Sequence, residues 1–152
     1  MTTTTRPAQA ADLPAIARLF DLYRQFYEQV ADAQRAADFI RQRLERNESV
    51  ILVAEDASGA LVGFCQLYPS FCSVEARPIG VLYDLFVLHE ARGQGAGRQL
   101  LLAAEARATA DGLARLDLTT ARTNTTAQRL YESLGWARDT VFLAYSRRLP
   151  AH

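Results

Sequence analysis

The chain has 152 residues, a formal net charge of zero and a composition that is 49% hydrophobic. Its 17 basic residues, all arginine, balance 17 acidic ones, so no net field favours nucleic acid or an anionic membrane. No apolar run reaches the ~18 residues of a membrane span, and the two cysteines and two histidines are too few for a disulfide framework or a metal site. We expect one cytoplasmic domain, residues 1–152, with Cys65 and Cys72 as free thiols and with no metal, nucleic-acid or membrane partner.

Helical and extended periodicities alternate along the chain and predict its elements. In chain order, these are a strand at residues 4–9, helices at 12–30 and 36–46, strands at 49–55, 60–68 and 79–88, a helix at 97–110, a strand at 114–120, a helix at 125–134 and a strand at 140–147. Residues 69–78 are expected to be a looser segment.

The order of these elements predicts the sheet. The turn sequence Asp-Ala-Ser-Gly at residues 56–59 indicates an antiparallel hairpin. The strand, helix and strand at 79–88, 97–110 and 114–120 imply a parallel pair with a right-handed crossover. The expected fold class is therefore α/β (α+β), with a mixed, largely antiparallel central sheet and helices on both faces.

A glycine-rich turn, Arg92-Gly93-Gln94-Gly95-Ala96-Gly97, lies between a predicted strand and a predicted helix. Alternate glycines remove Cβ atoms from a tight turn, so that backbone N–H groups can converge on an anion, and the start of the helix adds a partial positive charge. A dinucleotide fingerprint would need a further glycine where Arg98 stands, and a Walker loop would need a lysine, which the chain lacks. The turn predicts a different phosphate-containing ligand.

This turn, after the strand Leu-Tyr-Asp-Leu-Phe-Val, resembles the pyrophosphate loop of the GCN5-related N-acetyltransferase (GNAT) superfamily. A second segment, Asn124 to Trp136, resembles the superfamily's Asn…Ala…Leu-Tyr…Gly-aromatic signature. The predicted elements match that fold along essentially the whole chain, so the resemblance implies acetyl-coenzyme A as cosubstrate. The residues it implies for cofactor contact are Leu85, Phe86, Val87, Arg92, Gly93, Gln94, Gly95, Ala96, Gly97, Arg98, Asn124, Ala127 and Tyr131.

Catalytic roles follow from the same resemblance. Asn124 would bond the pantetheine arm and Tyr131 would protonate the departing thiolate, since a phenol of pKa ~10 can hold a proton for a thiol of pKa ~8.5. Taken alone, Asn124 would be interpreted as a helix cap and Tyr131 as a core aromatic, and it is the two motifs together that favour the functional interpretation. The thioester oxygen would be stabilised by backbone N–H groups around Phe86 and Val87.

A protonated amine must lose a proton before it can attack, and carboxylates are the candidate bases. Asp84 lies within a predicted central strand, and Glu28 ends the first helix. A buried salt bridge to an arginine is the alternative interpretation of Asp84. His89, at a strand end, is a weaker candidate.

The predicted activity is acetyl transfer to a small cationic, polyamine-like primary amine, by direct attack in a ternary complex. Both the central strand and the Phe-Tyr-Glu-Gln segment look like those of the polyamine, diamine and histone-acetyltransferase-like branch. Convergence of Glu28, Glu75 and Asp84 would favour such acceptors. The alternatives are acetylation of protein or peptide amines, and a coenzyme A-binding regulatory module without turnover. The apolar segment 142–145 suits either a homodimer contact or a buried strand.

Overall fold

The computed structural model describes residues 2–151. The chain divides into two compact units, residues 1–119 and 120–152. The expected single domain over the whole chain stays a prediction. Within the described residues, no helix is long and apolar enough to cross a membrane.

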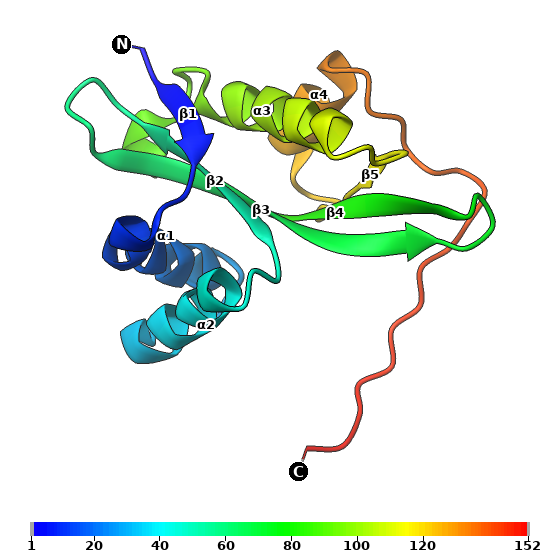
Figure 1. The fold of residues 1–152 in the computed structure, drawn as a ribbon, viewed down its shortest axis with the longest axis horizontal. Helices are drawn as coiled ribbons and strands as arrows, with labels where there is room; N and C mark the ends of the chain where they lie inside the picture. Colours follow the sequence, from blue (N-terminus) through cyan, green and yellow to red (C-terminus); the bar gives the residue numbers. More distant parts are fainter. Residues whose placement is uncertain (1, 152) are drawn as a thin grey trace. The chain divides into compact units, whose positions relative to one another are not determined.

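The first unit holds the sheet and most of the helices (Figure 1). Its elements are β1 (Thr4–Pro7), η1 (Ala10–Asp12), α1 (Leu13–Phe26), α2 (Ala33–Glu45), β2 (Val50–Glu55), β3 (Leu61–Cys72), β4 (Arg77–Val87), η2 (His89–Ala91), α3 (Ala96–Ala110) and β5 (Leu116–Asp117).

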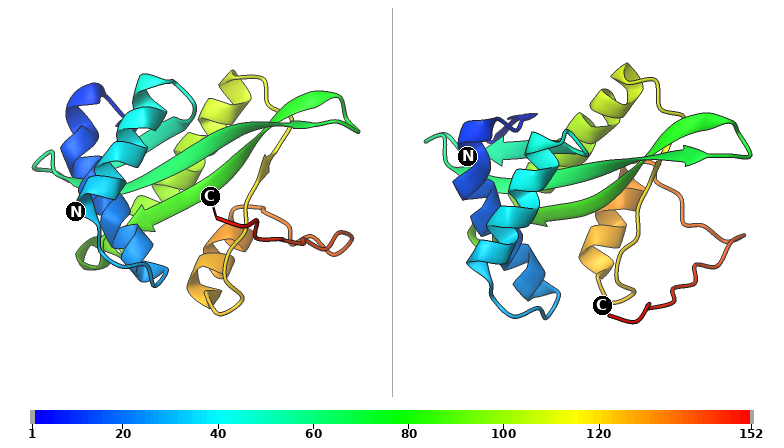
Figure 2. Two further views of the ribbon diagram at one scale, coloured as in Figure 1. Left: turned by 90° about the horizontal axis from the view of Figure 1, so that it is seen from below. Right: turned by 60° about the horizontal axis from the view of Figure 1, so that its bottom comes forward.

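The strands form one sheet in the order β1-β2-β3-β4-β5, in which every neighbouring pair is antiparallel except β4 and β5. Side chains along β3 alternate between its faces. Phe64 packs with the apolar residues of α1 and α2, whereas the Cys65 thiol lies 3.9 Å from the Leu100 carbonyl of α3. Helices therefore cover both faces (Figure 2), which confirms the predicted fold class. The pairing of β4 with β5 confirms the predicted parallel pair.

The β3–β4 hairpin is longer than the sequence predicted, and the prediction of a looser segment at residues 69–78 is wrong. The ladder continues to the pair Cys72 and Arg77. Pro78 is tolerated in β4 because its backbone groups face away from β3. On that outer side, the Pro78 carbonyl accepts a hydrogen bond from the Ala114 N–H (2.9 Å). Gly80 likewise donates toward β5, to the Arg115 carbonyl (3.1 Å), so its hairpin partner Pro69 needs no N–H for the ladder.

The second unit contains α4 (Thr125–Ser133) followed by a chain without further helix or strand as far as residue 151. The predicted strand at 140–147 is therefore wrong for the described residues. An apolar alternation forms a strand only where a neighbouring edge supplies hydrogen bonds. Here the N–H groups of Val141 and Phe142 instead donate to the Asp139 carboxylate (2.8 and 3.0 Å), which makes a local turn, and both side chains are exposed.

Candidate active site

The glycine turn forms an open, backbone-lined site at the start of α3. Gly93 and Gly95 adopt left-handed φ angles of +82° and +84°, and a Cβ built on either would meet no atom within 4 Å. Gly95 is the N-cap of α3, and no side chain caps the helix. The first-turn N–H groups are thus left for a ligand, and the positive end of the helix dipole favours an anion. Residues 92–98 form this turn and the first turn of α3, and their contact with a ligand stays a prediction.

The outer edge of β4 offers further backbone donors. The Leu88 N–H donates to the Val62 carbonyl (2.8 Å), so the alternating register directs the amide of Phe86 toward β3 and those of Leu85 and Val87 away from it. On that outer side, β5 pairs with β4 only at Gly80 and Val81. Beyond this point, the described part of the first unit has no strand alongside β4. The sequence expected donors around Phe86 and Val87, and the register gives these two amides different directions.

Asp84 is a buried carboxylate in the middle of β4, with only 5% of its surface exposed. Its Oδ2 accepts a hydrogen bond from the Gln66 Nε2 (2.8 Å), and the Gln66 Oε1 accepts one from the Ser49 hydroxyl (2.7 Å). The salt bridges found within residues 2–151 involve other carboxylates. The alternative of an arginine salt bridge is therefore not what the described residues form, because a neutral amide occupies that position.

Burial and hydrogen bonding act on Asp84 in opposite directions. Burial raises its pKa above the usual value, because the charged form loses solvation, while hydrogen bonds from Gln66 and from Tyr23 lower the pKa. Burial also raises the pKa of the nearby Tyr68 to about 12, with the Asp84 charge as the next cause. An acid whose pKa lies above its usual range suits proton transfer near neutral pH.

A β-bulge sets the direction of the Asp84 side chain. Gln66 pairs with Asp84 but Leu67 pairs with Leu82, so Tyr83 is an extra residue in β4. The extra residue reverses the alternation of β4. Residues two apart in a regular strand share one face, but here Leu82 and Asp84 face opposite sides of the sheet. Both are buried, and Tyr83 between them is exposed. The bulge places Asp84 on the face that α1 covers.

Aromatic rings lead from Asp84 toward the surface at the end of α1. The Tyr23 hydroxyl lies 3.3 Å from the Tyr83 carbonyl oxygen, and the Tyr23 ring lies 6.0 Å from Phe86 and 5.1 Å from Tyr27. Tyr27 in turn contacts Phe26 at 5.2 Å, and both are exposed. Such rings attract cations through their faces.

The other candidate side chains lie elsewhere. Glu28 is exposed just after α1, with a left-handed φ of 66°. Glu75 forms a salt bridge with Arg115 (2.9 Å) at the tip of the hairpin, roughly 20 Å along β4 from Asp84 at ~3.3 Å per residue. Glu75 therefore does not converge with Asp84, and it does not supply the charge that would favour a polyamine-like acceptor. The Arg92 Nε donates to the Val87 carbonyl (3.1 Å), and its guanidinium lies 5.8 Å from the Phe26 ring.

In the second unit, Asn124 and Tyr131 lie at opposite ends of α4. The Asn124 side chain caps the helix by accepting from the Ala127 N–H (3.2 Å). The ring of Tyr131 lies 6.1 Å from that of Trp136. The backbone N–H of Trp136 donates to the Tyr131 carbonyl (3.1 Å). The cap confirms the local interpretation of Asn124. The contacts of both residues with a cofactor stay predictions.

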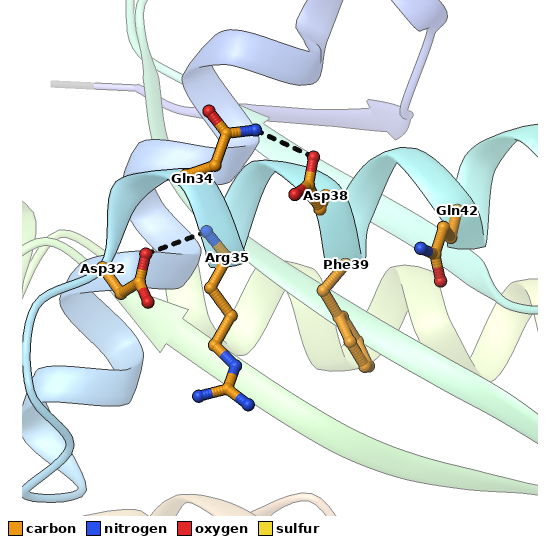
Figure 3. A pocket seen from close by; sticks show the side chains of 6 residues that line it. All are labelled: Asp32, Gln34, Arg35, Asp38, Phe39 and Gln42. Carbon is orange, nitrogen blue, oxygen red and sulfur yellow. Dashed lines mark hydrogen bonds between the residues drawn. The ribbon is translucent and has the colours of Figure 1, made fainter.

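A pocket of ≈ 400 Å³ runs along α2 (Figure 3). The residues that line it are Asp32, Gln34, Arg35, Asp38, Phe39 and Gln42. Both of its carboxylates serve the helix itself: Asp32 caps α2 by accepting from the Arg35 N–H (3.0 Å), and Asp38 accepts from Gln34 (2.9 Å). Because one helix supplies the whole lining and its acids are engaged, we place the chemistry at Asp84 instead. No cluster of three or more metal-ligating side chains occurs within residues 2–151.

Comparison with known proteins identifies the class to which this chain belongs. The family model "Acetyltransferase (GNAT) family" matches residues 16–136, and the chain belongs to this family of N-acetyltransferases.

Two relatives match most of the chain. An uncharacterized N-acetyltransferase of Bacillus subtilis (strain 168), YhfO, is 47% identical over 96% of this chain and 97% of its own length. An uncharacterized N-acetyltransferase of Archaeoglobus fulgidus is 30% identical over 84% of this chain and 88% of its own. Among solved structures, a probable acetyltransferase is 35% identical, with a TM-score of 0.90 and full coverage of both chains.

Three side chains around Asp84 were missed by the sequence analysis: Ser49, Gln66 and Tyr23. Gln66 carried a signal, because it is the one polar residue in the apolar run 61–67 and is fully buried in the structure. Tyr23 lies at helical spacing from Phe20 and Tyr27, a pattern that indicates a core position rather than a site. Ser49 gave no signal, since a serine before a strand is common in turns.

Proposed function

We propose that this enzyme transfers the acetyl group of acetyl-coenzyme A to the primary amine of a small cationic, polyamine-like substrate, by direct attack in a ternary complex. The observation that carries the proposal is the buried Asp84 carboxylate at the inner end of an aromatic path, in the part of β4 beyond its pairing with β5. The carboxylate and the rings are both complementary to an ammonium group.

Acetyl-coenzyme A is the acetyl donor used by the family. Gly93, Gly95 and the uncapped start of α3 suit its pyrophosphate, because they offer convergent N–H groups and no side chain in the way. In the second unit, Asn124 and Tyr131 are the residues we assign to the pantetheine arm and to the thiolate.

The proposed reaction has one proton to remove and one to supply. At neutral pH an alkylammonium of pKa ~10.4 must lose a proton, at a cost of about 4 to 5 kcal/mol, and Asp84 accepts it. The amine nitrogen then forms a bond to the thioester carbon, whose oxygen takes a hydrogen bond from the outward Val87 N–H. The C–S bond breaks with its electron pair on sulfur, and Tyr131 protonates the thiolate. Glu28 is a second candidate for accepting the amine proton.

A covalent acetyl-enzyme is disfavoured by the state of the buried cysteine. Burial raises the pKa of Cys65 to about 12, so its thiolate is scarcely populated at neutral pH. Direct attack needs no such nucleophile.

Release of coenzyme A thiol from acetyl-coenzyme A, measured with polyamines, amino acids, aminoglycosides and lysine peptides, tests the proposal. Polyamines should be turned over best, and Tyr131→Phe should slow the reaction about tenfold or more without weakening cofactor binding. Tyr145→Phe, at an exposed position in the same unit, is the matched control. Preference for lysine peptides would move the acceptor to proteins. Cofactor binding without release for any acceptor would favour a regulatory module.

Three expectations from the sequence remain proposals: a cytoplasmic location, a single domain over residues 1–152 and a homodimer. The exposed Phe142, Leu143 and Tyr145 support the last, because exposed apolar side chains gain by burial against a partner. Sedimentation analysis at several concentrations would test it.

A further inference from the structure

A chain of hydrogen bonds reaches Asp84 from the start of β2, across the neighbouring strand β3. The half-buried Ser49, just before β2, donates to the Oε1 of Gln66, and the Nε2 of Gln66 donates to the Oδ2 of Asp84 (2.7 and 2.8 Å). Gln66 itself has no exposed surface. A buried amide in a strand is costly unless both its ends are bonded, and here both are.

The Ser49 hydroxyl decides which end of the amide faces Asp84. With Oε1 held by Ser49, the N–H₂ group points at the carboxylate and donates to its charged form. A turned amide would instead present Oε1 to the carboxylate, and two acceptors would then face each other unless Asp84 were protonated. The orientation of Gln66 and the charge of Asp84 are therefore coupled.

We propose that Gln66 is a positioning residue for the acetyl transfer: held in one orientation by Ser49, it fixes the Asp84 carboxylate and keeps it ready to accept a proton. This inference rests on the proposed role of Asp84 as the base. Bound in this way, Oδ2 is committed to Gln66, and Tyr23 also bonds the carboxylate.

Other polar and ionisable groups surround Asp84, and they bear on its titration. They are Tyr23 from α1, Cys65 and Tyr68 from β3, and Tyr83 from β4. Arg43 of α2 acts on Tyr68. Arg43 is tied to Glu48 (3.3 Å) and to the Phe39 ring (4.3 Å), so it contributes only a distant charge. Gln66→Leu removes one hydrogen-bond donor to Asp84 with little change of shape, because leucine has a similar volume.

The first test titrates the aspartate side-chain carboxyl carbons by NMR, with the Asp84 signal assigned from its loss in Asp84→Asn. Gln66→Leu should raise the midpoint of the Asp84 signal by about one pH unit or more, because a donor to the charged form is lost. Ser49→Ala should raise it by less, and Ser49→Thr, which keeps the hydroxyl, should restore it. Ile51→Val is the packing control, since Ile51 is the cross-strand neighbour of Gln66.

An unchanged Asp84 midpoint in both Gln66→Leu and Ser49→Ala would overturn the inference, whatever the effect on melting temperature. Ser49→Ala, at a half-buried position, serves as the decisive variant if Gln66→Leu does not fold. These readouts need no substrate, so they do not depend on the proposed function.

The second test follows kcat/KM against pH with the best amine. The acidic limb should move upward by the same amount as the NMR midpoint in Gln66→Leu, and should stay in place in Ile51→Val. A midpoint that moves while the acidic limb does not would show that Asp84 is not the base, and would thereby overturn the catalytic role of Gln66.

Discussion

The glycine turn before α3 and the carboxylate of β4 lie in the same unit but are built in opposite ways. The turn offers main-chain N–H groups in an exposed loop, and its requirement is for two residues, Gly93 and Gly95, that adopt left-handed backbone angles. The Asp84 site is buried and depends on side chains from separate elements, among them Ser49 and Gln66.

This difference teaches where each function is vulnerable. A backbone site survives most changes of side chain but fails when the backbone conformation is lost. A buried polar site fails when one atom is changed, because the partner left behind is desolvated and unbonded. Substitutions at the two places should therefore affect different steps of the reaction.

The largest effect is expected from Asp84→Asn. The amide has nearly the same shape but cannot accept a proton at neutral pH, so kcat should fall by about 10²- to 10⁴-fold while affinity for coenzyme A is unchanged. Steady-state kinetics and calorimetry measure the two quantities. Asp38→Asn, on the exposed side of α2, is the control and should keep full activity. A variant of Asp84 that retains wild-type kcat would show that the carboxylate is structural.

Gly95→Ala should instead affect coenzyme A affinity, and Gly59→Ala is its matched control. Both glycines have φ near 85° (+84° and +85°), so each substitution should cost stability by about 1 kcal/mol through the same backbone strain. Only Gly95→Ala should weaken coenzyme A binding, by roughly tenfold, or about 1.4 kcal/mol. Thermal unfolding and calorimetry separate the two effects. Equal losses of affinity in both variants would remove the anion site from this turn.

The contrast between the sites also explains what the sequence could predict. The turn was found because its glycines, the strand before it and the helix after it are contiguous, so local rules suffice. The hydrogen bond from Gln66 to Asp84 joins residues 18 apart on paired strands, and their alignment depends on the bulge at Tyr83. A shift of one residue in register would turn Gln66 to the other face, and no local pattern fixes that register.

The errors in the fold have the same origin. Pro69 and Pro78 suggested a break in the hairpin, but their backbones face away from the β3–β4 ladder, which only the pairing reveals. The apolar alternation at residues 140–147 indicated a strand, yet a strand needs a partner edge that local sequence does not specify. Helices, whose hydrogen bonds are local, were predicted to within a few residues.

A smaller effect is expected on stability, with opposite pH dependence at two aspartates. Burial raises the folded pKa of Asp84, so its contribution to stability is present below the unfolded pKa of ~3.9 and is lost as pH rises through the folded value. Asp84→Asn should therefore melt a few degrees above the wild type at pH 7 to 8, and this gain should vanish near pH 4.

Asp12 provides the opposite case for the same measurement. Its hydrogen bonds with Arg6 (2.8 and 2.9 Å) lower its pKa, so its contribution is present above ~3.9 and is lost as pH falls through the folded value. Asp12→Asn should melt below the wild type at pH 7, with the difference disappearing in acid. Melting curves at several pH values would contradict this account if both variants changed with the same sign.

The smallest effect, on the affinity for coenzyme A, is expected from Arg92→Gln. Arg92 is the charged side chain at the start of the glycine turn. Its guanidinium is exposed and already donates to the Val87 carbonyl, so a phosphate would gain only a solvent-screened attraction. Affinity for coenzyme A should fall about two- to fivefold at ~0.1 M salt and hardly at all at ~1 M, where the screening length is about 3 Å. Arg18→Gln, on the exposed face of α1, should leave the affinity unchanged. A loss of coenzyme A affinity above tenfold that persists at high salt would contradict this account. It would mean that the Arg92 guanidinium leaves the Val87 carbonyl and binds the phosphate directly.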